Sequence, residues 1–468
     1  MSNNITKKAA IIGGGVIGGA WAARFVLMGW DVKLYDPSSG AQNINLEVLE
    51  RARKSLPALY DRSLPREGIL SFCDSIQEAV HDAHYIQESV PERLDLKHKV
   101  LSDIQASCLP EAVLASSTSG FKPSQLQEKT KRPEQILVCH PFNPVYLMPL
   151  VEVVPSIKTD IKISKKAQSI LKELGMKTLH INKEIDAHIA DRLLEAVWRE
   201  GLWLVHDDIA TTEQIDNAIR YGFGLRWAQM GLFETYRTAG GKTGMAHFIS
   251  QFGPALKWPW SKLVDVPELN EALVNKIAQQ SEMQSGQISL DALLDQRDKN
   301  LIALMRALKG ENWGAGALLN EHEARLEPCE PFLIERQIPP TFTDYNEHMN
   351  DACYAEIFSR ATDIFLDKVG GGTAYTKSGY SYFTVQMNIS YLDECHEGDK
   401  VYVSGKLIKA ERSKLVLALE LLRGSNKPHT NKPCARAEIT LVHVDLKTRK
   451  SCPPPEAIRA KLAEFRFG

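Results

Sequence analysis

The sequence predicts an α/β domain, then an all-α domain, then an α+β domain. A glycine-rich segment, residues 13–18, lies between a short apolar run and a helix-compatible stretch. From Ile189 to Val205 the apolar residues recur at helical spacing. After Gly370-Gly371-Gly372 apolar and polar residues alternate, which is typical of half-buried strands. The length of 468 residues is also too great for one typical domain.

Composition restricts the functional classes. Hydrophobic residues make up 44% of the chain and charged residues 24%, so each domain can bury a core. The formal net charge of -2 gives no reason to expect a nucleic acid or a membrane as partner. No apolar run has spanning length and the N-terminus lacks a signal-peptide core, so we expect a cytoplasmic protein. The eight dispersed cysteines predict reduced thiols and no metal site.

The first domain begins with a pattern typical of dinucleotide binding. Residues 9–12 are all apolar, as a strand buried on both faces requires, and residues 19–28 are compatible with a helix. Between them, Gly13 permits a tight turn, Gly15 lets a pyrophosphate approach the backbone, and Gly18 lets helix and strand pack closely. The residues expected at the cofactor are Gly13, Gly14, Gly15, Val16, Ile17 and Gly18.

Asp36 ends the second predicted strand and selects between the nicotinamide cofactors. Its carboxylate can accept a hydrogen bond from the ribose 2′-hydroxyl of NAD, and it would repel the 2′-phosphate of NADP. Residues 37–40 contain no Arg or Lys that would attract that phosphate. The sequence therefore predicts NAD.

Polar residues follow three further predicted strands. Glu92, Ser119 and His140 come after predicted strands at residues 85–90, 112–115 and 136–139. Because ligands bind beyond the carboxyl ends of strands in open α/β sheets, these side chains are expected on the cofactor side. His140 can take a proton near neutral pH, and Glu152 on the next predicted strand could hold its ring. The alternative is a surface histidine beside a proline-rich turn.

These motifs, in order and at fixed intervals, resemble the 3-hydroxyacyl-CoA dehydrogenase family over roughly the first 320 residues. That family also includes sugar-acid and L-carnitine dehydrogenases. The resemblance implies a Rossmann-type domain at residues 1–185 and a helical domain at 186–315 that forms a dimer. It implies active-site roles for Ser119, His140, Asn143 and Glu152, with His140 as the base for hydride transfer to NAD. It places Glu92 and Lys97 at the nicotinamide end of the cofactor.

One departure from the family concerns the substrate. Where acyl-CoA enzymes of the family have Asn, this chain has Asp191, within Ile189-Ala190-Asp191-Arg192-Leu193. Six of the eight tryptophans also lie between residues 198 and 313. An acid and aromatic rings suit a quaternary ammonium such as that of carnitine, and an arginine could hold its carboxylate. The substrate candidates are Asp191, Arg192, Arg226 and Trp227, and the alternative for each is packing or surface charge.

The pattern of apolar and polar residues changes in the rest of the chain. Residues 316–330 read as a linker before a domain at 331–468. Residues 332–338 are strand-like and 352–369 are amphipathic. Four alternating runs follow, at residues 382–391, 400–409, 414–422 and 435–445. One helix wrapped by antiparallel strands predicts an α+β hot-dog fold.

The segment from Asp344 to Asn350 resembles the D-x-x-x-H-x-N motif of 4-hydroxybenzoyl-CoA-type thioesterases. The resemblance implies that Asp344 is the catalytic carboxylate and that amides at the helix start hold the thioester oxygen. The alternative is that this segment only caps the helix.

Two halves in this order resemble carnitine dehydrogenases fused to a betainyl-CoA thioesterase. This implies oxidation of L-carnitine to 3-dehydrocarnitine, hydrolysis of a CoA thioester, and a homodimer. The alternative is another 3-hydroxyacyl-CoA or sugar-acid dehydrogenase that carries a non-catalytic hot-dog assembly module.

Overall fold

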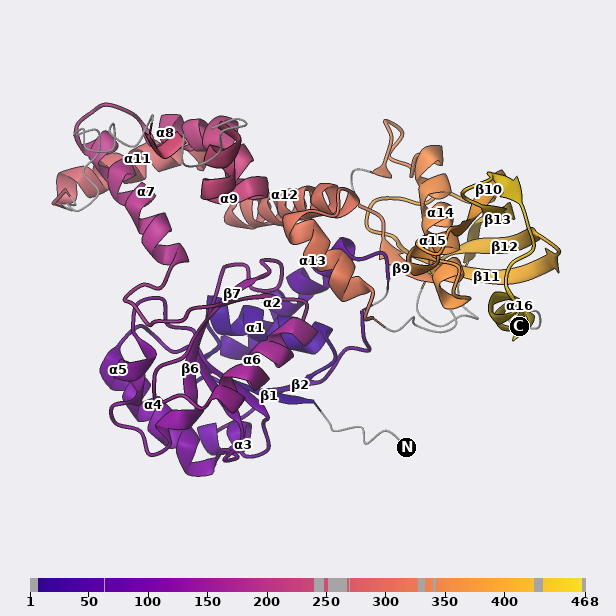
Figure 1. The fold of residues 1–468 in the computed structure, drawn as a ribbon. Helices are drawn as coiled ribbons and strands as arrows, with labels where there is room; N and C mark the ends of the chain where they lie inside the picture. The colour runs from indigo at the N-terminus through magenta and orange to yellow at the C-terminus, as the bar shows by residue number, and fades with distance from the viewer. Residues whose placement is uncertain are drawn as a thin grey trace. The chain divides into compact units, whose positions relative to one another are not determined.

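The computed structural model describes residues 7–62, 64–239, 248–250, 267–268, 270–326, 333–339, 342–424 and 432–464. The chain forms two compact units (Figure 1). The first comprises Met1–Ser55 and Gly68–His322, and the second comprises Leu56–Glu67 and Glu323–Gly468. In the described part of the chain, no helix has the length and apolar character needed to cross a membrane.

An eight-stranded sheet forms the centre of the first unit. Its order is β3-β2-β1-β4-β5-β6-β7-β8, and every pair is parallel except β6 and β7. The strands are β1 (Lys8–Ile12), β2 (Asp31–Tyr35), β3 (Leu70–Phe72), β4 (Tyr85–Glu88), β5 (Val113–Ser116), β6 (Ile136–Pro141), β7 (Leu150–Val154) and β8 (Lys177–His180). Strands β4, β5 and β6 are buried throughout, as expected for central strands of a sheet covered on both faces.

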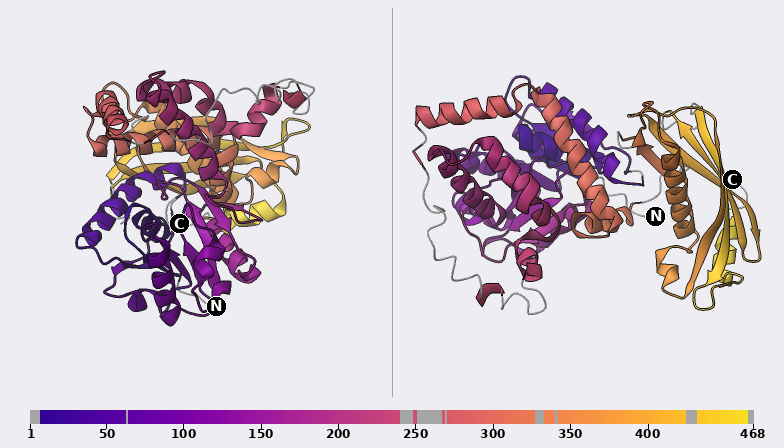
Figure 2. Two further views of the ribbon diagram at one scale, coloured as in Figure 1. Left: turned by 90° about the vertical axis from the view of Figure 1, so that its left-hand side faces the viewer. Right: turned by 90° about the horizontal axis from the view of Figure 1, so that it is seen from above.

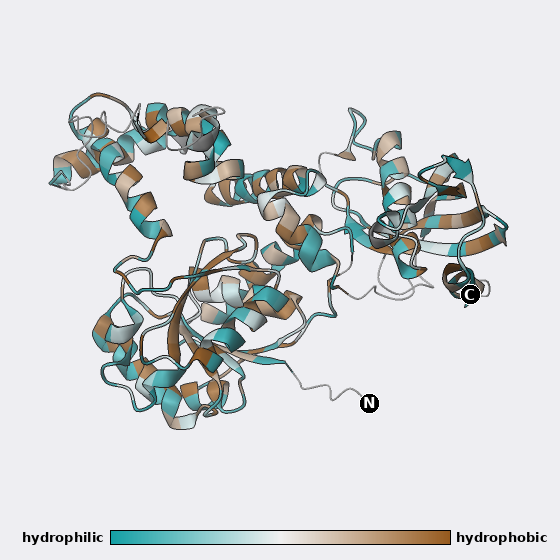
Figure 3. Cartoon of the chain, viewed as in Figure 1, coloured by the Kyte–Doolittle hydropathy of each residue, from teal (hydrophilic) through white to brown (hydrophobic). Residues whose placement is uncertain are grey.

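Helices lie on both faces of this sheet (Figure 1), as expected for a doubly wound fold. They are α1 (Val16–Leu27), α2 (Ala41–Ser55), α3 (Ile76–Val80), α4 (Leu94–Ser107), α5 (Pro123–Gln127) and α6 (Ile161–Glu173), with a 3-10 turn, η2, at Pro133–Gln135. Hydrophobic residues run along the central strands (Figure 3), and together with the helices they form the core. The predicted Rossmann-type domain is confirmed.

The remainder of the first unit is helical, as predicted. It comprises α7 (Ala190–His206), α8 (Thr212–Ala218), η3 (Ile219–Phe223), α9 (Gly224–Ala239), α11 (Glu271–Ser285), α12 (Leu290–Gly310) and α13 (Gly314–Glu323). Helix α13 extends into the segment expected as a linker, residues 316–330. It is held there because Leu319 is buried and His322 Nε2 lies 2.9 Å from the carbonyl of Glu173.

Many apolar side chains of this helical part face outward. On α7, Leu193, Leu194 and Trp198 are all more than half exposed. Trp227 and Trp313 are also partly exposed. Two further tryptophans of the predicted aromatic cluster, Trp258 and Trp260, lie outside the described residues.

The second unit has one long helix against an antiparallel sheet (Figure 2), which confirms the predicted hot-dog fold. The sheet order is β10-β13-β12-β11-β9, and β14 pairs with β13. The strands are β9 (Ile334–Gln337), β10 (Tyr380–Tyr391), β11 (Lys400–Glu411), β12 (Lys414–Arg423), β13 (Lys432–Asp445) and β14 (Lys450–Ser451). The helices are α14 (Asp351–Lys368), α15 (Thr373–Thr376) and α16 (Glu456–Glu464).

The core of this unit lies between α14 and the sheet, where Ile357, Phe358 and Ala361 are fully buried. A segment from far earlier in the sequence joins it. The 3-10 turn η1 (Pro57–Leu59) packs against β9, and Asp61 Oδ1 lies 3.8 Å from Nη1 of the buried Arg336.

Candidate active sites

The glycine turn between β1 and α1 has the geometry that a pyrophosphate needs. Gly13 has a φ of +99°, which favours glycine. A Cβ on Gly18 would lie 1.8 Å from the carbonyl oxygen of Gly13, so only glycine allows α1 to pack this closely. A Cβ on Gly15 would meet nothing within 4 Å, which leaves open space on the side where the ligand is expected.

Asp36, just after β2, lies beside this turn. Its Oδ2 accepts a hydrogen bond from Gly14 N at 2.6 Å, and its Oδ1 accepts one from Ser38 N at 2.8 Å. These bonds fix the carboxylate next to the expected position of the adenosine ribose. The residues present therefore fit NAD.

Glu92 and Lys97 lie at the carboxyl ends of β4 and β5. The ammonium of Lys97 is buried, 2.9 Å from Glu88 Oε1 and 3.3 Å from Glu92 Oε2. Glu92 also accepts hydrogen bonds from the Thr118 hydroxyl and from Gly120 N. Burial alone would raise the pKa of Glu92, but the Thr118 hydroxyl and Lys97 outweigh it and the pKa is lowered. Glu92 is therefore a fixed carboxylate at this edge of the sheet.

Sequence reasoning missed Glu88, which is completely buried against Lys97. The available signal was a charged residue at the end of an otherwise buried strand. An acid in such a position requires a partner.

His140 and Glu152 face each other across β6 and β7. The two residues are paired in the antiparallel register, and Nδ1 of His140 lies 3.0 Å from Oε2 of Glu152. The other oxygen of Glu152 accepts hydrogen bonds from Ile189 N at 3.0 Å and Ala190 N at 2.9 Å. Glu152 therefore joins the imidazole to the start of α7.

The charge of Glu152 follows from these contacts. Burial alone would raise its pKa, but the hydrogen bonds from His140 and from the two backbone amides outweigh burial, and the pKa is lowered. Because an ionised carboxylate only accepts, Nδ1 of His140 carries a proton, and in the neutral ring the lone pair is on Nε2. The ring is thus oriented to act as a base through Nε2.

Asp191, in the first turn of α7, faces that second nitrogen. Its Oδ2 lies 3.7 Å from His140 Nε2. Burial raises the pKa of Asp191, and attraction to His140 opposes this effect. Asp191 is the only one of the four substrate candidates with a contact to His140; within the described residues, no hydrogen bond, ion pair or ring contact links the exposed Arg192, Arg226 or Trp227 to it.

Ser119 and Asn143 come from the loops after β5 and β6. Ser119 is partly buried, whereas Asn143 is exposed. In the described part of the chain neither has a hydrogen bond to His140. Their roles stay predictions.

A second histidine near the site was not predicted from the sequence. His188 is fully buried, its ring centroid lies 5.6 Å from that of His140, and its Nε2 lies 3.2 Å from Thr118 O. Burial lowers its pKa, so the ring is neutral at physiological pH. Its Nδ1 is buried and has no hydrogen-bond partner among the residues that the structure describes. Nothing in the local pattern distinguished it from a core residue.

In the second unit Asp344 closes a tight turn before α14. Its Oδ1 accepts a hydrogen bond from Asn346 N at 2.8 Å, and its backbone N donates to His348 O at 2.8 Å. The helix cap is Asn350, the last residue of the segment for which capping was the alternative, and its side chain accepts from Ala352 N at 2.9 Å. That amide is therefore not available to hold a thioester oxygen, as the motif resemblance had implied for the helix start.

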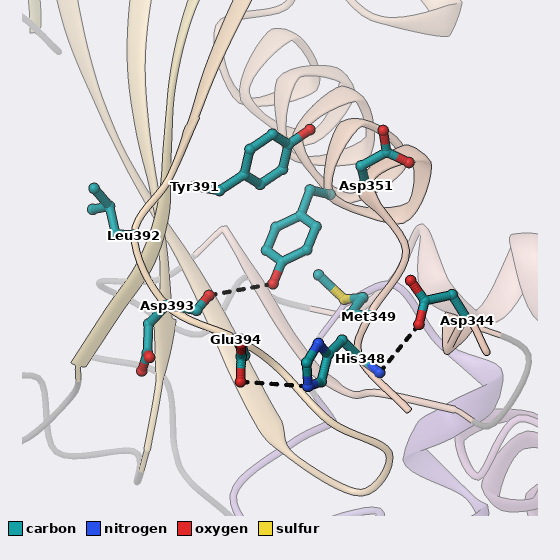
Figure 4. Close-up of a pocket in the computed structure, with 9 residues that line it drawn as sticks. Asp344, His348, Met349, Asp351, Tyr391, Leu392, Asp393 and Glu394 are labelled. Atoms are coloured by element: carbon teal, nitrogen blue, oxygen red, sulfur yellow. Dashed lines mark hydrogen bonds and ion pairs between the residues drawn. The ribbon is translucent and has the colours of Figure 1, made fainter. Parts of the chain in front are cut away.

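Asp344 also lines a cavity of about 610 Å³ at the start of α14 (Figure 4). The wall comes from the turn before the helix, the helix itself and the segment after β10. The lining residues are Asp344, His348, Met349, Asp351, Tyr354, Tyr391, Leu392, Asp393 and Glu394. A carboxylate in a cavity at a helix start is compatible with acyl-transfer chemistry.

Comparisons with known proteins agree with this architecture. The model of the 3-hydroxyacyl-CoA dehydrogenase NAD-binding domain matches residues 8–185, and that of its C-terminal domain matches 188–279. The thioesterase-like superfamily model matches residues 338–462. The crystal structure of a 5-formyl-3-hydroxy-2-methylpyridine 4-carboxylic acid 5-dehydrogenase is similar, with a TM-score of 0.55 and 25% identity, over 65% of this chain and 99% of that one.

Close relatives span both halves. A Ruegeria pomeroyi protein named L-carnitine dehydrogenase/betainyl-CoA thioesterase is 53% identical, over 98% of this chain and 96% of that protein. A Rhizobium meliloti protein of the same name is 45% identical, over 98% and 95%. A Mesorhizobium japonicum protein named L-carnitine dehydrogenase is 52% identical, over 69% of this chain and 90% of that protein.

The glycine turn with Asp36 and the His140–Glu152 pair define an NAD-dependent dehydrogenase. This chain belongs to the 3-hydroxyacyl-CoA dehydrogenase family and carries a thioesterase-like domain behind its dehydrogenase half.

Proposed function

We propose that this chain is a bifunctional enzyme. Its first unit oxidises the 3-hydroxyl of L-carnitine to 3-dehydrocarnitine with NAD, and its second unit hydrolyses betainyl-CoA. The names of relatives that match nearly the whole chain support this pair of activities. Within the structure, the observation that carries the carnitine assignment is the carboxylate of Asp191 beside Nε2 of His140.

In the proposed oxidation, Nε2 of His140 accepts the proton of the substrate hydroxyl. Glu152 holds the ring through Nδ1 and stabilises the imidazolium that forms, because its lowered pKa keeps it ionised. NAD, when bound at the glycine turn, supplies the acceptor for the hydride from C3. Ser119 and Asn143 hydrogen-bond the substrate oxygen and hold it toward His140.

Asp191 is well placed to attract the substrate ammonium. In carnitine the trimethylammonium is joined by one methylene to the carbon that bears the hydroxyl, so a group beside His140 Nε2 is also near the ammonium. A trimethylammonium cannot donate a conventional hydrogen bond, and a carboxylate attracts it by charge alone. We further propose that Arg192 or Arg226 binds the substrate carboxylate and that Trp227 contributes to the ammonium pocket.

For the second unit we propose that Asp344 is the catalytic carboxylate. Its Oδ1 is held by backbone hydrogen bonds, and within the described residues its Oδ2 has no hydrogen-bond partner. The second oxygen is thus positioned to act on a thioester in the cavity.

We propose that the enzyme is a cytoplasmic homodimer. Support for the dimer comes from the outward apolar side chains of α7, Leu193, Leu194 and Trp198, because exposed apolar patches of this kind mark interaction surfaces. The cysteines in the described part of the chain are free, as a reducing compartment requires.

Two assays with the purified full chain test the proposal. NADH formation is followed with L-carnitine and NAD, and release of free CoA is followed with betainyl-CoA. Choline-like cations should compete with the first substrate, because they carry the same trimethylammonium. Oxidation of 3-hydroxybutyryl-CoA or a sugar acid, with no turnover of carnitine, would contradict the proposal.

A further inference from the structure

Two tyrosines from different elements meet in the cavity at the start of α14. Tyr354 lies on α14 and is 4% exposed, whereas Tyr391 ends β10 and is 53% exposed. Their ring centroids are 5.1 Å apart and the rings are nearly perpendicular, at 84°. Figure 4 shows Tyr391 beside the start of α14, where Asp351 lies. The cavity therefore has two aromatic surfaces that face in different directions.

The same cavity is acidic. Four of its lining residues are carboxylates, and none is Lys or Arg. Two of the four have partners: Asp393 Oδ2 lies 2.7 Å from Arg423 Nη2, and Glu394 lies 3.4 Å from His348 Nε2.

Asp344 and Asp351 differ from those two acids. Their hydrogen bonds come from backbone amides, and within the described residues no Lys, Arg or His forms an ion pair with either. Excess negative charge next to aromatic rings favours a cation that has no hydrogen bonds to donate. It disfavours the phosphate end of coenzyme A, so this lining is expected to face the acyl end of the thioester.

The distance between cation and reacting carbonyl is short in the proposed substrate. In betainyl-CoA one methylene separates the trimethylammonium from the thioester carbon. If Asp344 acts on that carbon, the cation must lie in the same cavity, next to it. Among the described residues, Asp351 is the lining acid other than Asp344 that has no ion pair, and Tyr354 and Tyr391 are the aromatic rings of the lining.

We propose that Tyr354, Tyr391 and Asp351 form a subsite that binds the quaternary ammonium of the acyl group and makes the second unit selective for betainyl thioesters. This rests on the proposed thioesterase function and adds the residues that recognise the substrate. Asp351 supplies the charge and the tyrosines supply the ring faces. Asp344 remains the group that acts on the carbonyl.

The test compares betainyl-CoA with 3,3-dimethylbutyryl-CoA, in which a carbon replaces the nitrogen and the shape is kept. The ratio of kcat/KM for the two thioesters isolates the contribution of the positive charge. The full chain should prefer betainyl-CoA by about tenfold or more. Tyr391→Leu and Asp351→Asn should each lower that preference by about tenfold, mainly through the KM for betainyl-CoA.

Tyr391→Phe is the matched control, because it keeps the ring and removes only the hydroxyl. It should retain the preference. Tyr391 is half exposed, so these substitutions spare the core, which a change at the buried Tyr354 would not. Hydrolysis of 3,3-dimethylbutyryl-CoA reports that the second unit of each variant is folded, because this thioester does not need the ammonium subsite.

Three results would overturn the proposal in distinguishable ways. If neither thioester is hydrolysed, the proposed thioesterase function fails and the subsite with it. If both are hydrolysed equally, the thioesterase stands and the ammonium subsite is wrong. If Tyr391→Leu and Asp351→Asn both keep the full preference for betainyl-CoA, other groups recognise the ammonium and the proposed subsite is wrong.

Discussion

Asp191 Oδ2 lies 3.7 Å from Nε2 of His140, the ring nitrogen that does not contact Glu152. The imidazole therefore lies between two carboxylates, one that orients it and one that faces the expected substrate. Both favour the imidazolium that forms when the substrate hydroxyl loses its proton. In the proposed function Asp191 also attracts the substrate ammonium, so that one acid acts on both the base and the choice of substrate.

Replacing Asp191 by Asn tests that link. The variant should bind carnitine about tenfold or more weakly, because an amide cannot compensate the charge of the ammonium. The measurement is KM for carnitine together with KM for NAD, which should stay unchanged. Asp186→Asn is a suitable control, because Asp186 is exposed and pairs with Lys122. Equal effects of the two substitutions on KM for carnitine would contradict the role of Asp191.

Glu152→Gln should reduce kcat by roughly 10²–10⁴. A neutral amide does not stabilise the imidazolium, and it can leave Nδ1 without its acceptor. Stopped-flow measurement of the chemical step at saturating carnitine and NAD would check this. A variant with near-normal turnover would show that Glu152 only anchors the start of α7.

Glu152 should also make the stability of the first unit depend on pH. Its pKa in the folded state is below the ordinary value of 4.5. The contribution of Glu152 to the free energy of unfolding is therefore fully present above pH 4.5. It is lost as the pH falls through the lower pKa of the folded state. Calorimetric unfolding between pH 6 and 3 should show that the stability of Glu152→Gln falls less steeply with decreasing pH than that of the wild type. Identical slopes would mean that the carboxylate is not held as described.

Asp36 should determine the choice of cofactor. Asp36→Asn removes the charge that repels a 2′-phosphate, so the ratio of kcat/KM for NAD over NADP should fall by about tenfold or more. Asp31→Asn, at the opposite end of β2, is the control and should leave the ratio unchanged. A ratio that stays the same in both variants would exclude Asp36 from ribose recognition.

Asp344→Asn should abolish release of CoA from betainyl-CoA and leave NADH production intact. The amide keeps an oxygen for Asn346 N, so the turn before α14 should persist. Continued hydrolysis at the wild-type rate would exclude Asp344 as the catalytic group.

Local patterns were sufficient where the contacts are local. The glycine turn was predictable because Gly13 and Gly18 have steric requirements that only the nearby strand and helix impose. The contact of His140 with Glu152 followed from two strands close in sequence, which the antiparallel β6 and β7 bring into register. The order of the three domains was predictable because the spacing of apolar residues differs between them: short apolar runs in the first, helical spacing in the second and alternation in the third.

Contacts between distant segments were not predictable. The contact of His188 with the carbonyl of Thr118 depends on how the segment before α7 returns to the end of β5. The inclusion of residues 56–67 in the second unit depends on the packing of η1 against β9, far away in sequence. The cap at Asn350 lies within the segment expected at the helix start, but the turn that Asp344 closes before it follows a path that no short motif specifies.

The central claim is that His140 is the base in NAD-dependent oxidation of L-carnitine. The most direct measurement is the initial rate of NADH formation by wild type and by His140→Gln, with NAD affinity measured in parallel. The account predicts that His140→Gln binds NAD normally and forms NADH roughly 10²–10⁴ times more slowly. Near-normal turnover with intact NAD binding would contradict it.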